Sequence, residues 1–197
     1  MSFLLRLLTT ALALTVAIQL PGQQFQFGAS AGIIASQIDG DNLRGFNKIG
    51  YQGGLLGGYA LDERNWIAVE LRHAAFGSVK KQEQRAHVAV ELRSIDVVLG
   101  YARRFGDRWD GQQRFRIQGG PRLHRVIKVK SDMIDKEDIN TFFLSVQVGV
   151  SHLVSPAAQI DLSYTHGLTD ILATSIAEIG KLQPYYLSLG ASYFFGR

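Results

Sequence analysis

The sequence predicts an all-β protein: one eight-stranded, antiparallel, up-and-down β-barrel that crosses a membrane, with short periplasmic turns and four longer external loops. Three observations predict it. The chain opens with the pattern of an export signal, apolar and polar residues then alternate with a period of two, and short and long connections alternate between the patterned segments. With 197 residues, 46% hydrophobic and 19% charged, the chain can form one folded domain and is not disordered.

Residues 1–22 have the pattern of a secretory signal peptide. Arg6 provides the positive charge, and the apolar run of residues 7–20 is ended by a proline–glycine pair. This run is too short and too often interrupted by polar residues for a typical transmembrane helix, although an inner-membrane anchor is the competing interpretation. We expect a cleaved signal peptide at residues 1–22 and a barrel domain at residues 23–197. The chain has no cysteine, so no disulfide or lipoprotein anchor is expected.

The first four predicted strands are residues 25–33, 51–59, 67–72 and 94–102. The first two are rich in glycine, which weakens a flat strand but permits the sharp coiling of a small barrel and makes room for large lumen side chains. The other two alternate aliphatic and aromatic residues with polar, small or charged ones.

The last four predicted strands are residues 114–124, 144–151, 159–166 and 187–195. The alternation is clearest in residues 159–166, where no position breaks it. All eight segments can reach about ten residues, which is the length that a tilted strand needs to cross a bilayer.

The connections fall into two classes that alternate along the chain. Three are short, at residues 61–65, 106–113 and 154–157. Four are longer and more polar, at residues 36–50, 76–90, 127–140 and 167–184. An up-and-down barrel with short periplasmic turns and long external loops produces this pattern, whereas a soluble Greek-key sandwich is not expected to.

The polar face of the strands carries charges of both signs at mid-strand positions. These residues are Glu70, Arg72, Asp96, Arg116, Arg122 and Asp161. In a membrane barrel the apolar face meets lipid and the polar face lines the lumen, so we expect these side chains to pair with one another and to fill a narrow lumen. The alternative is a solvated outer face of a soluble protein.

Aromatic residues gather at the ends of the predicted strands, where the interfacial girdle of a membrane barrel belongs. They are Phe25, Phe27, Tyr51, Tyr59, Trp66, Tyr101, Phe105, Phe142, Tyr185, Tyr193, Phe194 and Phe195. The alternative is aromatic packing in a core. The last strand also ends in aromatic residues, which is typical of outer-membrane barrels. We therefore expect the bacterial outer membrane as location, with its lipid and the barrel assembly machinery as partners.

Two motifs near the start of the barrel domain resemble a known family. They are SQIDGD at residues 36–41 and GFNKIG at residues 45–50, and generic support comes from residues 66–72 and from QGGP at residues 118–121. Together they resemble the PorT-like outer-membrane β-barrel family of Bacteroidetes. The resemblance implies an eight-stranded outer-membrane barrel, mostly without assigned function. A few relatives take part in type IX secretion, but nothing in the sequence marks this chain as one of them.

Motifs for catalysis, cofactors and metals are missing, so we expect no catalytic, cofactor-binding or metal-binding residues. The five histidines lack ligand spacing, and residues 39–42 fit a solvated turn better than a calcium loop. Ser151 and His152 are adjacent and would point to opposite faces of a strand, which argues against a catalytic pair. The net charge is +4, and the basic residues are mixed with acidic residues along the whole chain. No basic patch results, so no nucleic-acid partner is expected.

The sequence therefore favours a non-enzymatic, integral outer-membrane barrel. Its role is expected to be structural, or to depend on the external loops binding an unidentified envelope or extracellular partner. Three alternatives stay open: a soluble, lipocalin-like ligand-binding barrel in the periplasm, a component associated with type IX protein secretion, and an outer-membrane lipid-modifying enzyme.

Overall fold

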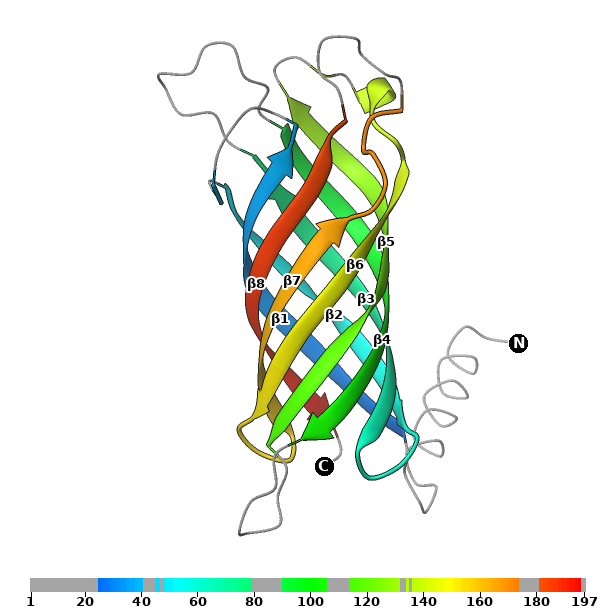
Figure 1. The fold of residues 1–197 in the computed structure, drawn as a ribbon, viewed down its shortest axis with the longest axis vertical. Coiled ribbons are helices and arrows are strands. Elements are labelled where there is room, and N and C mark those ends of the chain that lie inside the picture. The colour runs from blue at the N-terminus through cyan, green and yellow to red at the C-terminus, as the bar shows by residue number, and fades with distance from the viewer. Residues whose placement is uncertain are drawn as a thin grey trace, which may run out of the picture.

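The structure is a computed structural model that describes residues 25–40, 45–46, 48–78, 90–105, 114–131, 134, 136–173 and 181–195. Eight antiparallel strands form a closed barrel in which each strand pairs with the next and β8 pairs with β1 (Figure 1). The strands are β1 Phe25–Asp39, β2 Lys48–Ala60, β3 Asn65–Gly77, β4 Val90–Phe105, β5 Phe115–Ser131, β6 Phe142–Leu153, β7 Ala158–Gly167 and β8 Gln183–Phe195. The predicted fold is confirmed. The predicted signal peptide and the turn at residues 106–113 lie outside the described residues.

The outer face of the barrel is apolar, in agreement with the prediction that the apolar face of each strand meets lipid. Leu55, Ile117 and Leu162 point outward with 64%, 55% and 48% of their surface exposed, although such residues would form the core of a soluble protein. This belt surrounds all eight strands and is the surface that lipid would cover. It excludes the soluble lipocalin-like alternative, because that fold needs its apolar face inside.

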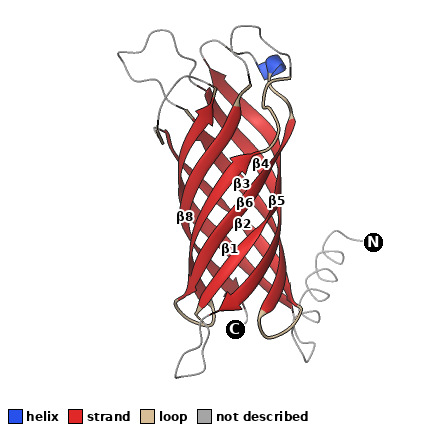
Figure 2. Ribbon diagram, viewed as in Figure 1, coloured by secondary structure: helices blue, strands red, loops and turns tan. Residues whose placement is uncertain are grey.

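Helix makes almost no contribution to the described part of the chain (Figure 2). One short 3-10 helix, η1, spans Lys136–Asp138 beside the external end of β5. Among the described residues, no helix is long and apolar enough to cross a membrane.

The strands are longer than the sequence predicted, and most of the additional residues lie at the external end. β1 continues to Asp39 and β5 to Ser131, so both enter segments that were predicted as loops. In these external segments the inward positions are apolar and no longer polar: Ile34, Phe76 and Leu92 point inward and are fully buried. Since the expected pattern was apolar outside and polar inside, it could not identify strands that have left the membrane and enclose an apolar interior.

Two aromatic residues were wrongly assigned to the girdle. Trp66 and Phe194 are only 4% and 3% exposed and lie inside the lumen, whereas Tyr193 and Phe195 point outward. The strand parity explains the difference, because Trp66 shares the face of Glu70, and Phe194 lies between two outward-facing neighbours. The alternative of aromatic core packing applies to these two residues.

Candidate functional site: the lumen

The lumen has an ionic layer at mid-height in which two strands, β4 and β5, contribute a buried ion pair. Arg122 and Asp96 are both fully buried, and the Nε and Nη2 atoms of Arg122 donate to Asp96 Oδ2 at 3.1 and 2.5 Å. Arg72 pairs with Glu70, two residues before it on β3. A buried guanidinium is tolerated only when a countercharge and acceptors compensate for its lost hydration. Both arginines have a carboxylate partner, although the buried Nε atom of Arg72 has no hydrogen-bond partner in the described part of the chain.

Two glutamines connect the ion pairs across the lumen. The Oε1 atom of Gln147 accepts from Arg72 and from Arg122, both at 3.3 Å. Gln52 Oε1 accepts from the same two arginines at 3.1 and 3.4 Å. The ionic layer therefore joins β2, β3, β4, β5 and β6 in one network.

A second polar group lies closer to the periplasmic end. The carboxylate of Asp161 accepts from Ser151 Oγ at 2.6 Å, Gln159 Nε2 at 2.7 Å and Ser192 Oγ at 2.6 Å. Arg116 donates to Gln159 Oε1 at 3.1 Å, and its guanidinium carbon lies 4.8 Å from the centroid of the Trp66 ring. The side-chain amide of Gln159 thus bridges Arg116 and Asp161.

All six predicted lumen residues lie on the lumen face, but they fall into these two groups instead of one network. The sequence reasoning did not select Gln52, Gln147 and Gln159, which supply the bridging hydrogen bonds. Their position on the polar face of predicted strands was a usable signal. Their partners were not predictable, because Arg72 and Gln147 are 75 residues apart.

A buried Asp–His–Ser arrangement lies beside the ionic layer. His124 Nε2 lies 2.7 Å from Ser145 Oγ, and His124 Nδ1 lies 2.9 Å from Asp96 Oδ1, in an orientation that makes no hydrogen bond. The order of residues resembles a catalytic triad. However, all three side chains are at most 1% exposed, and the Phe143 ring stacks on the imidazole with centroids 4.1 Å apart. The arrangement therefore has no access for a substrate.

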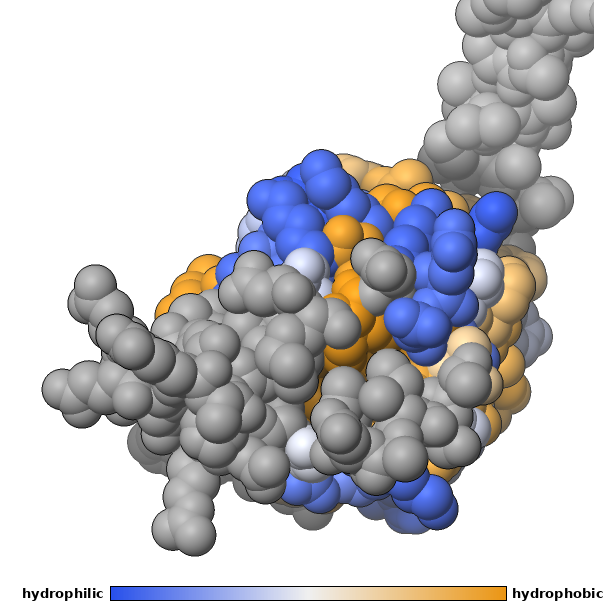
Figure 3. Space-filling model, turned by 90° about the horizontal axis from the view of Figure 1, so that it is seen from above, coloured by the Kyte–Doolittle hydropathy of each residue, from blue (hydrophilic) through white to orange (hydrophobic). Residues whose placement is uncertain are grey.

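Apolar side chains close both ends of the lumen. At the periplasmic end, Leu56, Trp66, Ala102 and Phe194 form one cluster. At the external end a larger cluster, here called the external plug, fills the barrel; it comprises Ile34, Ile38, Ala74, Phe76, Val90, Leu92, Val126, Ile134, Ile139, Phe143, Ile171, Leu172, Leu182 and Tyr186. Seen from this end, apolar surface lies at the mouth between hydrophilic residues (Figure 3).

Two external connections form part of the plug and are fastened to each other. The segment after β5 and the segment after β7 meet in a β-bridge between Ile139 and Leu172. The Asn140 side chain donates to the carbonyl oxygens of Asp170 and Leu172 at 3.1 and 2.8 Å. Asp170 Oδ1 accepts from the backbone N–H groups of Leu172 and Leu182 at 2.9 and 3.1 Å. The remainder of these connections includes residues that lie outside the described part.

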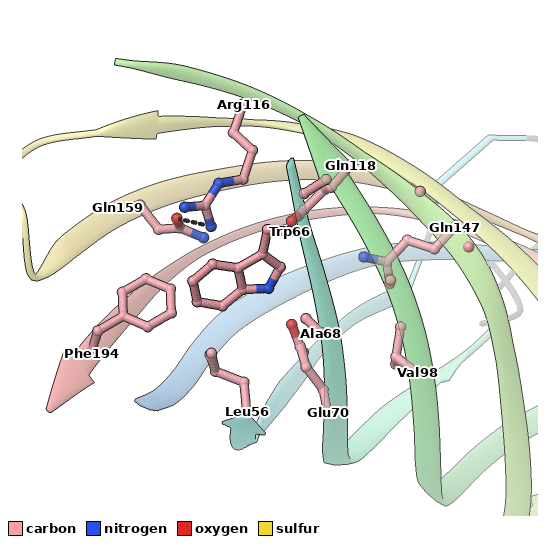
Figure 4. A pocket seen from close by; sticks show the side chains of 14 residues that line it. Leu56, Trp66, Ala68, Glu70, Val98, Arg116, Gln118, Gln147, Gln159 and Phe194 are labelled. Atoms are coloured by element: carbon pink, nitrogen blue, oxygen red, sulfur yellow. Dashed lines mark hydrogen bonds between the residues drawn. The ribbon is translucent and has the colours of Figure 1, made fainter. Parts of the chain in front are cut away.

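A small cavity lies between the ionic layer and the periplasmic cluster (Figure 4). The side chains of Trp66, Arg116, Glu70 and Gln147 surround it. Its lining joins an aromatic ring, a cation and an acid without a set of metal ligands. Among the described residues, no group of three or more His, Asp or Glu could hold a metal ion.

A family model matches almost the whole chain. The model of the outer membrane protein beta-barrel domain matches residues 7–195. The chain belongs to this family. This outer membrane beta-barrel domain is therefore located in the bacterial outer membrane, as predicted. Among curated proteins, no relative matches the chain.

Solved structures of outer-membrane proteins share the fold of this chain. Ail, the attachment invasion locus protein of Yersinia pestis, solved with the heparin analogue sucrose octasulfate, is 14% identical with a TM-score of 0.51. That match covers 88% of this outer membrane beta-barrel domain and 100% of Ail. Neisserial surface protein A is 18% identical with a TM-score of 0.51, and the match covers 87% of this chain and 97% of that one. At these identities the likeness shows the fold alone.

Proposed function

We propose that this chain is a non-enzymatic, non-conducting outer-membrane barrel that acts as a structural element of the envelope or through its external loops. One observation carries the proposal: the lumen is closed in three successive layers, by the periplasmic cluster, the ionic layer and the external plug. A barrel of eight strands is just wide enough for side chains to fill, which agrees with this arrangement. The interaction surface would then lie on the outside of the barrel.

The attachment of two external connections to the plug supports a role for the loops. Asn140 and Asp170 hold these connections together, and Ile139 and Leu172 are buried in the plug. A partner that docks on a surface fixed in advance loses less conformational entropy than one that must order flexible loops. The plug thus serves both as a seal and as the foundation of a binding surface.

Conductance measurements test the closed lumen. The full chain, folded and inserted into planar lipid bilayers, should give no stable conductance steps under an applied voltage, while a general porin in the same bilayers does. Stable steps from the folded chain would contradict the proposal, because the three layers leave no continuous aqueous path.

Complementation of a deletion strain distinguishes the two forms of the proposal. We expect deletion of the gene to weaken the envelope, measured as entry of a large antibiotic. A chain in which residues 173–181 are replaced by a Gly/Ser segment of equal length keeps the barrel. It should restore the barrier if the role is structural and fail if the loop binds a partner. A deletion strain with an intact barrier and unchanged surface binding would contradict both.

The buried Asp96–His124–Ser145 arrangement allows a separate test of the non-enzymatic assignment. A fluorophosphonate probe, which reacts with activated serine hydroxyls, should leave the folded barrel unlabelled because Ser145 is 1% exposed. Labelling that disappears in Ser145→Ala would contradict the assignment and favour the outer-membrane enzyme.

The finer family assignment supplies a second candidate function. The motifs at residues 36–41 and 45–50 favour a PorT-like barrel of Bacteroidetes, a group in which a few members take part in type IX secretion. In that case deletion should reduce the release of type IX cargo into the medium, and the wild-type gene should restore it. Normal cargo release in the deletion strain would remove this candidate.

A further inference from the structure

The hairpin formed by β4 and β5 carries a group of cations on its outer surface, just external to the apolar belt. On β5 the outward side chains change from Leu123 to Arg125 and Lys128, and on β4 from Ile95 to Arg93. Arg125 pairs in register with Ile95 on one side and with Phe142 on the other, and both of those are exposed apolar side chains. The cations therefore begin where the lipid-facing surface ends.

A β-bulge concentrates these charges. The register between β4 and β5 shifts between Arg93 and Ser94, so that Ile127 has no partner and Arg93 lies directly opposite Lys128. Side chains in directly opposed positions have Cβ atoms about 4.5–5.5 Å apart, and like charges there repel. An anion located between the two side chains would relieve this repulsion.

The described residues supply only part of the negative charge that these cations need. Glu91 is the nearest acid, with an oxygen 3.7 Å from Arg93 Nη2, but its other oxygen is 2.8 Å from Lys48 Nζ. No acidic side chain in the described part of the chain forms an ion pair with Arg125 or Lys128, and both residues are exposed.

The group lies on one hairpin and does not continue onto β6, β7, β8 and β1. Towards the external ends of β1, β6, β7 and β8, outward positions are occupied by apolar, aromatic or histidine side chains, namely Ala35, Phe142, His166 and Tyr185. A general need for solubility would place charges around the whole rim. The concentration of these cations on the β4–β5 hairpin indicates a local anion.

We propose that Arg93, Arg125 and Lys128 bind the phosphate groups of a phosphorylated glycolipid in the external leaflet of the outer membrane. The position supports a lipid, because the cations face outward beside exposed Ile127 and immediately external to exposed Ile95 and Leu123. The chemistry supports phosphate, since a guanidinium can donate two parallel hydrogen bonds to it and an ammonium adds a point charge. The acyl chains of the lipid would lie along the apolar belt below.

Native mass spectrometry of the full chain tests this site. The barrel is inserted into phosphatidylcholine nanodiscs containing diphosphoryl lipid A, and bound lipid A is counted after release. The double variant R125Q/K128Q should bind lipid A about 25-fold more weakly, because each of the two cations near a charged membrane surface contributes on the order of 1 kcal/mol, about a fivefold change in affinity. Heat-modifiable gel mobility confirms that each variant is folded.

The matched control removes two exposed cations from the periplasmic end, as R64Q/R103Q, and should leave lipid A binding unchanged. Fully dephosphorylated lipid A should bind the wild-type barrel as weakly as diphosphoryl lipid A binds R125Q/K128Q. Equal binding of the two lipids, an equal loss in the control variant, or undiminished binding by R125Q/K128Q would each overturn the proposal.

Discussion

At the scale of single residues, the buried ion pair of Arg122 and Asp96 dominates the lumen. Each charge has lost its hydration and depends on the other, so removal of one leaves the other uncompensated. By contrast, Ser163 and Ser188 form a neutral hydrogen bond with their Oγ atoms 2.7 Å apart. A neutral pair of this kind contributes only about 1 kcal/mol.

A double-mutant cycle tests the pair. Arg122→Met and Asp96→Asn should each lower the free energy of unfolding by about 3–5 kcal/mol, because each leaves a buried group without its counter-charge. The double variant should lose less than the sum of the two. Urea unfolding in lipid vesicles measures all three, with Ser163→Ala as the control at about 1 kcal/mol. Additive losses would show that the two charges are independent.

At the scale of the strands, glycine spacing decides which large side chains fit the lumen. A Cβ atom on Gly58 of β2 would lie 2.0 Å from Cζ2 of Trp66, so the indole occupies the space that the missing side chain leaves. Gly100 of β4 also faces the lumen, yet a Cβ there would meet only the Ala68 carbonyl oxygen at 3.9 Å. Both glycines lie in strands with alternating apolar and polar residues, but only Gly58 makes room for a large side chain.

We therefore expect Gly58→Ala to be destabilising and Gly100→Ala to be tolerated. The first must displace Trp66 from the periplasmic cluster, at a cost of about 1–3 kcal/mol for overpacking. Urea unfolding measures the cost, and Trp66 fluorescence in a Trp109→Phe background reports the displacement. Equal stability of the two variants would contradict this account of the cluster.

The periplasmic turn between β2 and β3 depends on one carboxylate. Asp62 Oδ1 accepts from the backbone N–H groups of Arg64 and Asn65, both at 2.7 Å, and Asp62 Oδ2 accepts from Asn65 Nδ2 at 2.6 Å. The bond from the Asn65 side chain, followed by the two backbone bonds, holds the pKa of Asp62 below its ordinary value. A lowered pKa means that the carboxylate stabilises the turn above its ordinary pKa and loses this effect as pH falls through the lowered value.

An NMR titration of the Asp62 carboxyl in the folded barrel should give a midpoint below that of an aspartate in an unstructured peptide. In Asn65→Ala the midpoint should rise, because the largest contribution has been removed. An unchanged midpoint in this variant would assign the shift to the backbone alone.

At the scale of the whole molecule, an exposed side chain of this barrel can contact either lipid or water. Leu162 on β7 and Leu61 in a periplasmic turn are 48% and 47% exposed, so their accessible surface is nearly the same. Leu162 belongs to the lipid-facing belt, whereas Leu61 lies beyond the end of β2. Solvent-accessible surface thus does not distinguish contact with lipid from contact with water.

The bilayer distinguishes them. Leu162→Lys should lower the free energy of unfolding from vesicles by about 2–4 kcal/mol, the cost of a lysine near the bilayer midplane, while Leu61→Lys should change it by less than about 1 kcal/mol. Similar losses in both variants, measured by urea titration, would place Leu162 outside the hydrocarbon.

The sequence by itself determined the number of strands, the order of their connections and the face that meets lipid. These properties depend on local alternation and on the lengths of connections, which any reader of the chain can follow. It also placed Glu70, Arg72, Asp96, Arg116, Arg122 and Asp161 on the inner face. The same parity assigns Trp66 and Phe194 to the lumen, although their aromatic character favoured the girdle.

Only the tertiary structure decided which lumen residues touch one another. Arg122 reaches Asp96 across 26 residues of sequence and Gln52 across 70, and these contacts depend on strand register and on the curvature that closes β8 onto β1. The external plug could not be predicted from the sequence either, because its members come from six strands and from two connections. Alternation fixes the direction of each side chain, but contact across a lumen depends on the height at which each strand carries it.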